Sequence, residues 1–149
     1  MIYDVKVIGA GSPILDILVN VEDEFIEKHA GGGKGGTCLV NSDDFDKILS
    51  KIDSSRKIAP GGSSANTIFG LSQLGLKTAF LGMLGNDGNA RLYIERYAKM
   101  GGDISNFKKN PSLPTGRCLC MISGDSQRTM RTDLAAAMTL SPMDISEPD

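Results

Sequence analysis

Short apolar runs alternate along the chain with segments of helical spacing, which predicts a mixture of strands and helices. Consecutive or alternating apolar residues predict strands at residues 3–10, 14–21, 38–41, 77–84, 117–122 and 127–131. Apolar residues three and four apart predict helices at residues 42–51, 63–74 and 89–100, a short helix or turn at 22–29, and a further helix opening at Pro142. We expect Ser42 to cap the helix at 42–51, and Ser63 or Ser64 to cap the helix at 63–74.

The order of these segments indicates an α/β fold. Strands and helices alternate after residue 60, which argues for a mostly parallel sheet flanked by helices. The strands before residue 60 and those within residues 117–131 could form a separate small sheet, with the last two strands antiparallel. The sequence shows no internal repeat and no domain boundary, so we expect residues 1–149 to belong to one domain.

Composition and charge narrow the classes of function. Hydrophobic residues make up 40% of the 149 residues and charged residues 23%, as in a globular protein with an apolar core. The net charge is −2 without a block of like charge, which argues against a nucleic-acid partner. No apolar run approaches the roughly 20 residues of a membrane span, and the first residues resemble a strand rather than a signal peptide. We therefore expect a cytoplasmic protein with no membrane partner.

The cysteines and the single histidine do not indicate a metal site. Cys118 and Cys120 are two residues apart within an apolar run, so we expect them to share one face of a strand. Cys38 is the third cysteine and His29 the only histidine, which leaves too few ligands for a metal. Reduced, structural cysteines are the expected state.

Two glycine-rich segments suggest nucleotide-binding motifs but do not complete them. Gly9-Ala10-Gly11 follows a predicted strand, as in a dinucleotide-binding domain of an oxidoreductase. The third small residue is absent, because Ile14 stands there and a second β-rich run follows. Residues 31–36 include Lys34 but lack the full P-loop pattern, so we expect a surface loop there.

Two other segments hold polar side chains in places that suit a ligand. Asp16 lies within the apolar run at residues 14–21, where it either points to solvent or accepts hydrogen bonds from two neighbouring hydroxyl groups of a sugar. Gly61 and Gly62 lead into the predicted helix at 63–74, where backbone can approach a ligand closely and Ser63 and Asn66 add polar groups. Either feature alone leaves the function open.

Three blocks of sequence, in order, carry a resemblance to a known family. They are GAGSPILDI at residues 9–17, PGGSSANTIFGLSQLGLKTAFLGMLGNDGNA at 60–90, and TGRCLCMISGDSQRTMRTDLAAAMTLSP at 115–142. The second block includes a turn at Gly85, Asp87 and Gly88 that is typical of the first signature of the family. The chain resembles the N-terminal part of the PfkB carbohydrate kinases, and its first and third blocks are most similar to adenosine-kinase-like members.

The resemblance implies a ribokinase-like three-layer α/β/α fold with a small β-sheet lid. It implies a sugar or nucleoside substrate held by Asp16 at a diol and by Asn66 at a hydroxyl group. Gly61 and Gly62 would lie against the sugar and act as a hinge for lid closure. Ser12 is a further expected contact with the substrate, at a position where several members have asparagine.

The resemblance also assigns the hairpin at residues 117–131 and the segment that follows it. Met130 and Leu134 stand where adenosine-kinase-like members place apolar side chains near the base. Arg128 lies on the same hairpin, where an exposed arginine and a substrate contact are both compatible with the pattern. The lid sheet is a dimer surface in some members, which makes a homodimer possible.

The second family signature, a D-T-x-G-A-G-D-like stretch, does not occur in this sequence. In the family it supplies the catalytic base and the anion hole, and the ATP and Mg²⁺ site lies in the same C-terminal half. We therefore expect no catalytic residue in residues 1–149, a fold that stops before this half, and an inactive chain. The alternative is a non-catalytic module that binds a sugar or nucleoside without ATP.

Overall fold

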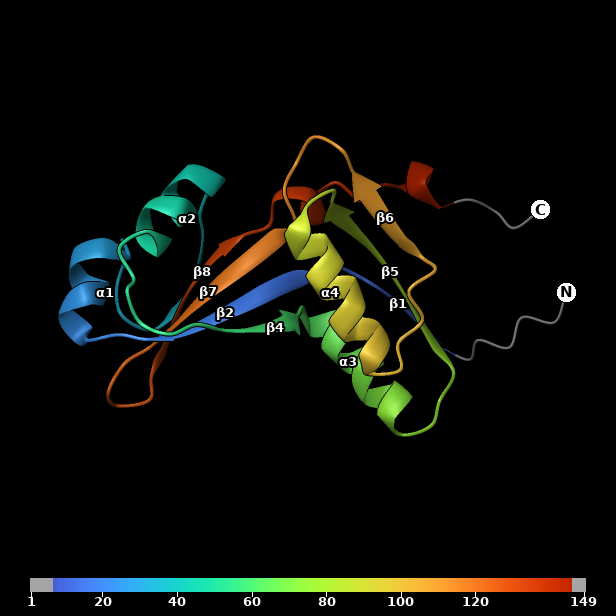
Figure 1. Cartoon of the computed structure of the whole chain (residues 1–149), viewed down its shortest axis with the longest axis horizontal. Coiled ribbons are helices and arrows are strands. Elements are labelled where there is room, and N and C mark those ends of the chain that lie inside the picture. Colours follow the sequence, from blue (N-terminus) through green and yellow to red (C-terminus); the bar gives the residue numbers. More distant parts are fainter. Residues whose placement is uncertain (1–6, 146–149) are drawn as a thin grey trace, which may run out of the picture.

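The computed structural model of the chain describes residues 7–145 and contains two sheets side by side (Figure 1). The predicted strand at 3–10 is seen as β1 (Val7–Ala10), and its first four residues lie outside the described residues. The predicted parallel sheet and a second, separate sheet are both present, but β1, which precedes residue 60, pairs with β5 in the parallel sheet, and the second sheet is the larger of the two. The first sheet has three strands and the second has five.

The three-stranded sheet has the order β1-β5-β6 and is parallel throughout. Its other strands are β5 (Thr78–Gly85) and β6 (Phe107–Asn110), and α3 (Ser63–Gln73) and α4 (Gly88–Lys99) pack against it. The shared core is apolar and largely aromatic. Its buried members are Leu15, Ala65, Ile68, Phe80, Leu84, Ala90, Tyr93 and Tyr97.

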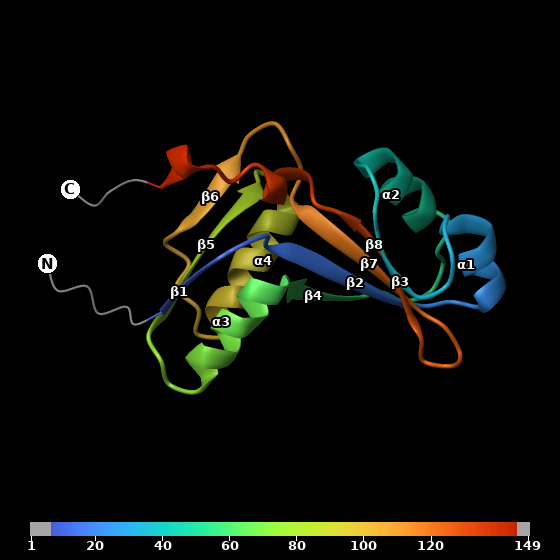
Figure 2. The ribbon, with the colours of Figure 1, turned by 180° about the vertical axis from the view of Figure 1, so that it is seen from behind.

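The five-stranded sheet has the order β3-β8-β7-β2-β4 and is mixed. Its strands are β2 (Ile14–Asn20), β3 (Gly36–Leu39), β4 (Lys57–Gly61), β7 (Gly116–Ile122) and β8 (Arg128–Asp133). The central pair β2 and β7 is parallel, whereas β7 and β8 form an antiparallel hairpin, as predicted. Figure 2 shows this sheet extending away from the three-stranded sheet.

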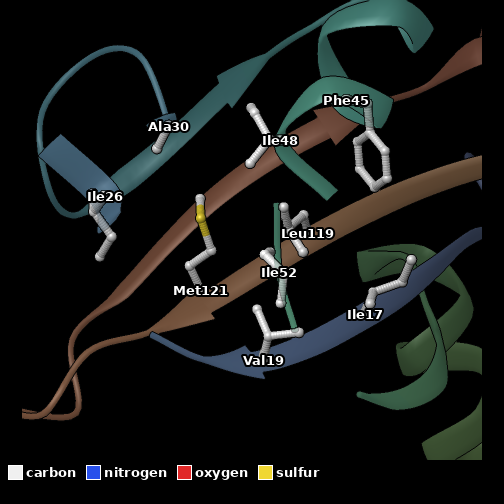
Figure 3. Close-up of a cluster of buried hydrophobic side chains, with 9 residues drawn as sticks. All are labelled: Ile17, Val19, Ile26, Ala30, Phe45, Ile48, Ile52, Leu119 and Met121. Carbon is white, nitrogen blue, oxygen red and sulfur yellow. The ribbon is translucent and has the colours of Figure 1, made fainter. Parts of the chain in front are cut away.

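Helices α1 (Asp23–His29) and α2 (Ser42–Leu49) cover one face of the five-stranded sheet. Figure 3 shows the apolar cluster between them and the strands. Its members are Ile17, Val19, Ile26, Ala30, Phe45, Ile48, Ile52, Leu119 and Met121. The side chains that alternate with these along β2 and β7 therefore belong to the opposite face.

Both predicted serine caps are wrong. The carbonyl oxygen of the Asn41 side chain accepts a hydrogen bond from the Asp44 amide at 2.8 Å, so Asn41 caps α2. The Ser42 hydroxyl group instead donates to Asp133. Helix α3 begins after Gly62 without a side-chain cap, and the Ser64 hydroxyl group donates to the backbone of β1. The hydroxyl groups of Ser42 and Ser64 therefore form hydrogen bonds with residues far away in the sequence and do not cap the helices.

The helix expected at Pro142 is limited to a 3-10 turn, η2 (Pro142–Asp144), which Ser141 and Asp144 close with a capping box. A second 3-10 turn, η1 (Ala135–Met138), packs against β5.

Strands β4 and β6 were not predicted. Gly75 ends α3 with a φ of 86°, as expected of a left-handed glycine after a helix.

The glycine-rich segment at residues 31–36 is held by charged side chains. The guanidinium group of Arg131 is buried and donates to the carbonyl oxygens of Ala30 and Gly31. Lys34 forms ion pairs with Asp23 and Asp125 at 2.8 Å each. These bonds make the segment an anchored loop between α1 and β3, and they engage the lysine that a P-loop would use for phosphate.

Candidate functional site

Asp16 lies in β2, the strand next to the edge strand β4, on the face of the five-stranded sheet opposite α1 and α2. It stands directly opposite Cys118 of β7 and Ala59 of β4. Its neighbours Leu15 and Ile17 are buried on the other side of the strand. Because side chains alternate along the strand, the Asp16 side chain points away from the apolar core, and Asp16 is only partly buried.

Gly61 gives the Asp16 carboxylate room. A Cβ atom at residue 61 would lie 2.4 Å from Asp16 Oδ2 and 2.5 Å from its Cγ. The carbonyl oxygen of Gly61 accepts a hydrogen bond of 3.0 Å from the buried Tyr93 hydroxyl group. The carboxylate therefore lies against a backbone segment that α4 fixes from behind.

Replacing Gly61 with alanine should push the Asp16 carboxylate out of its position. A Cβ atom at such short distances forces a shift, and the backbone of Gly61 is held by Tyr93. We expect a loss of stability of about 1 kcal/mol, at the lower end for overpacked sites, because the atoms that the added Cβ meets belong to the end of the Asp16 side chain. Gly70→Ala is the matched control, because an added Cβ there meets nothing within 4 Å. Urea unfolding should show a loss for Gly61→Ala only, and equal midpoints for both variants would contradict this account.

Gly62 and Ser12 form the junction between β1, β2 and α3. Gly62 has a φ of 106°, and a Cβ atom there would lie 2.4 Å from the backbone oxygen of Ser12. The Ser12 hydroxyl group donates to the carbonyl oxygen of Ala137 at 3.4 Å. Ser12 thus packs beside the glycine pair, with its side chain engaged by η1.

Ser63 and Asn66 lie in the first turn of α3 and are exposed. The backbone amide of Asn66 donates a hydrogen bond of 2.8 Å to the carbonyl oxygen of Gly62, and this is the first hydrogen bond of the helix. The segment from Gly61 to Asn66 therefore runs from the edge of the Asp16 carboxylate to the start of the helix. The structure brings Gly61 against Asp16, whereas Gly62 lies against Ser12 and Ala65.

Met130 shares the face of Asp16 but lies farther along the sheet. In the strand register Asp16 stands opposite Cys118, which stands opposite Thr132, and Met130 is one pair away beside Cys120. Leu134 follows β8 and is the residue before η1. Both residues are partly buried, and Met130 borders this face without filling the core.

Burial raises the pKa of the Asp16 carboxyl group, and the positive charge of Arg128 opposes this rise. Among residues 7–145 no side chain or backbone group donates a hydrogen bond to this carboxylate. The carboxylate oxygens are not among the fully buried atoms that lack a partner, so in this structure they face solvent and are free to accept hydrogen bonds from a ligand. Arg128 is exposed, and its charge reaches the site across the hairpin.

Further residues on this face were not predicted as site residues, namely Leu39, Cys118, Cys120 and Thr132. Leu39 is 67% exposed and stands opposite Thr132, whose hydroxyl group donates to Cys118 at 3.3 Å. The two predicted strand-mates Cys118 and Cys120 are both buried and free, as expected. Alternation alone could place each residue on a face, but only the strand order shows that these faces coincide.

Other features of the described residues do not compete with this site. A cavity of about 410 Å³ lies on the helix-covered side, between α1, α2 and β3. Within residues 7–145 no cluster of three or more histidine, cysteine or acidic side chains could hold a metal ion. No helix in that range is long and apolar enough to cross a membrane. Strand β2, and not a helix, follows Gly11, which removes the dinucleotide-binding interpretation.

Comparison with known proteins gives consistent matches. A sequence model described as pfkB family carbohydrate kinase matches residues 37–148. The adenosine kinase of Dictyostelium discoideum is 29% identical over 139 residues, which are 90% of this chain and 39% of that protein. The 5-dehydro-2-deoxygluconokinase of Geobacillus kaustophilus is 37% identical over 118 residues, which are 76% of this chain and 35% of that protein.

Solved structures agree with the sequence matches. The adenosine kinase of Sinorhizobium meliloti superposes with a TM-score of 0.84 at 28% identity, over 97% of this chain and 43% of that one. The Anopheles gambiae adenosine kinase, in complex with P1,P4-di(adenosine-5) tetraphosphate, gives 0.83 at 25% identity, over 96% and 45%. The chain therefore spans less than half the length of the relatives that it matches.

Proposed function

Because this chain belongs to the pfkB family of carbohydrate kinases, we propose that it forms the substrate-binding part of a kinase. The reaction is transfer of the ATP γ-phosphate to a primary hydroxyl group of a sugar or nucleoside. The fold supports this proposal, since it is α/β with a small sheet beside the parallel one, as in the adenosine kinases that it resembles. The five-stranded sheet would be the lid.

The observation that carries the proposal is the Asp16 carboxylate. It is half-buried, its pKa is raised by burial, and no donor among residues 7–145 satisfies it. Its two oxygens can accept one hydrogen bond each from the two neighbouring hydroxyl groups of a ribose. Such charge-assisted hydrogen bonds are about twice as strong as neutral ones, so the diol would be the main determinant of affinity.

The residues around Asp16 suit the remainder of a nucleoside. Gly61 and Gly62 expose backbone at the edge of the carboxylate, and the exposed Asn66 and Ser63 can hydrogen-bond sugar hydroxyl groups. The apolar side chains of Met130 and Leu134 would then contact the base. Several of the similar structures are adenosine kinases, one of them in complex with adenosine, which makes adenosine the first compound to try.

ATP and Mg²⁺ do not have an evident site among residues 7–145. The structure there offers no cluster of acidic ligands, and the one glycine-rich loop uses its lysine for ion pairs. We derive no step through either group. We place the catalytic base and the nucleotide site in the part of the family fold that this chain does not span, so the 149-residue chain should bind substrate without phosphorylating it.

Calorimetric titration with adenosine tests the binding, and 2′,3′-dideoxyadenosine is the matched ligand without the diol. We expect adenosine to bind at least about 100-fold more tightly, since two hydrogen bonds to a carboxylate are lost in the dideoxy compound. Equal affinities would refute the role of Asp16. Incubation of the chain with adenosine and ATP should give no AMP. If the wild type forms more AMP than the Asp16→Ala variant does, the chain is not inactive. Binding by a native protein that never phosphorylates would favour a non-catalytic binding module.

A further inference from the structure

The turn between β5 and α4 contains an acidic residue that the proposed substrate site does not use. Asp87 Oδ1 accepts a hydrogen bond from the Ala90 amide at 2.8 Å, which caps α4. Both carboxylate oxygens also bond Thr115, with Oδ2 accepting from its amide at 2.9 Å and Oδ1 from its hydroxyl group at 2.7 Å. One side chain therefore joins a helix to a distant segment of the chain.

Thr115 extends this connection to the end of β5. It is fully buried, and its hydroxyl oxygen accepts a hydrogen bond of 3.1 Å from the Gly85 amide. A Cβ atom at Gly85 would lie 2.5 Å from the Thr115 nitrogen, so only glycine permits this approach. Burial alone would raise the pKa of Asp87, but hydrogen bonds from Thr115, Ala90 and Asn89 lower it overall, which keeps the acceptor ionised.

Thr115 is also the last residue before the five-stranded sheet on the path from β6 to β7. The chain passes between the two sheets at residues 10–14, 61–63, 110–116 and 133–135. Strand β7 pairs with β2 along its whole length, with Gly116 opposite Ile14 and Cys118 opposite Asp16. The place at which Thr115 is held thus determines where the strand beside Asp16 begins.

We propose that Asp87 is a positioning residue that, through Thr115, fixes the five-stranded sheet against the three-stranded sheet and thereby aligns Asp16. Its effect on substrate affinity rests on the proposed function, whereas its effect on the sheet does not. Capping of α4 is a separate task of the same carboxylate. The two tasks can be separated because they use different donors.

The Asp87→Asn variant of the 149-residue chain separates the capping of α4 from the contact with Thr115. Asparagine is as good a helix cap as aspartate, but it has one acceptor oxygen, so its amide group must face either Thr115 or Ala90 with an unpaired N–H. If the remaining oxygen keeps facing Ala90, the NH2 group replaces Oδ2 and faces the Thr115 amide, so that hydrogen bond is lost while the cap is kept. We expect the amides of β2 and β7 around Asp16 to exchange hydrogen at least about ten-fold faster by NMR. Adenosine should bind at least about ten-fold more weakly in calorimetry.

Asn41→Ala is the matched control, since it removes the cap of α2 without touching the crossing between the sheets. It should leave both measurements unchanged. Thr115→Ser keeps the hydroxyl group and should behave as the wild type, whereas Thr115→Val removes the hydrogen bonds of that group with Asp87 and Gly85 and should also speed exchange around Asp16. This second pair decides the matter if Asp87→Asn does not fold.

The two measurements separate the possible failures. Unchanged exchange around Asp16 in both Asp87→Asn and Thr115→Val would overturn the positioning role and leave Asp87 as a helix cap. Faster exchange with unchanged adenosine affinity would overturn the link between the sheet position and binding. If the wild type binds neither adenosine nor another diol, the proposed function fails, and exchange around Asp16 alone still decides whether Asp87 positions the sheet.

Discussion

Replacing Asp16 with asparagine should abolish nucleoside binding and at the same time stabilise the fold at neutral pH. Asparagine keeps the shape of the side chain but has one acceptor oxygen and no charge. Two charge-assisted hydrogen bonds to the diol are therefore lost or weakened, which corresponds to about 3 kcal/mol or more and to an affinity at least about 100-fold lower. Calorimetry with adenosine measures this loss, and an unchanged affinity would mean that Asp16 does not contact the sugar.

The stability effect follows from the raised pKa of the same carboxyl group. The folded chain holds this proton more tightly than the unfolded chain, whose Asp16 has a pKa near 3.8. The protonated group thus favours folding fully below that pH, and this contribution is lost as the pH rises through the folded pKa. Asp16→Asn should raise the Tm at pH 7 and lose its advantage near pH 3.

A control for this measurement is Asp53→Asn, which removes one exposed charge away from the site. Its Tm at pH 7 should stay close to that of the wild type. Adenosine affinity of the wild type should also fall on acidification, beginning above the usual titration range of aspartate, because only the ionised carboxylate accepts both hydrogen bonds. A destabilised Asp16→Asn variant would show that Asp16 has a partner in the fold.

The second large effect is expected for Gly62→Ala, which should lower the free energy of unfolding by about 3 kcal/mol or more. Alanine there must adopt a φ of 106°, and its Cβ atom would lie 2.4 Å from the backbone oxygen of Ser12. Backbone cannot yield as a flexible side chain can. The junction of β1, β2 and α3 would have to move.

Gly75→Ala separates the two causes. Gly75 has a φ of 86°, but an added Cβ there meets nothing within 4 Å, so only the conformational penalty of about 1 kcal/mol applies. Urea unfolding of both variants should show a clearly larger loss for Gly62→Ala. Equal losses would mean that the Ser12 segment relaxes freely, and Gly62 would then be required for its φ alone.

Strands in the interior of the sheets were predictable, and strands at their edges were less so. Interior strand β5 is almost entirely buried and apolar. Strand β6 has the sequence FKKN and lies at an edge of the three-stranded sheet, while β4 contains Pro60 and lies at an edge of the five-stranded sheet. Lysine and proline are typical of edge strands, where they prevent further pairing, and they hide the apolar alternation that identifies a strand.

The site was predictable in its parts but not in its arrangement. The interruption of an apolar run by Asp16 was visible in the sequence, and the pattern left solvent and substrate as alternatives. Contact between Asp16 and Gly61 depends on the antiparallel pairing of β2 with β4, which no local pattern specifies. The hydrogen bond from Tyr93 to Gly61 likewise joins helix α4 to strand β4, and two elements lie between them in the chain.

The pairing of β2 with β7 also determines when the site can form during folding. Asp16 lies beside Cys118, so a large loop must close before this ladder exists, and such long-range pairing folds slowly. On the ribosome β2 can meet β4 first, as an antiparallel pair with an open apolar edge. The strand that carries Asp16 therefore reaches its native surroundings only after Ile122 has emerged, and until then its edge is open to aggregation or to a chaperone.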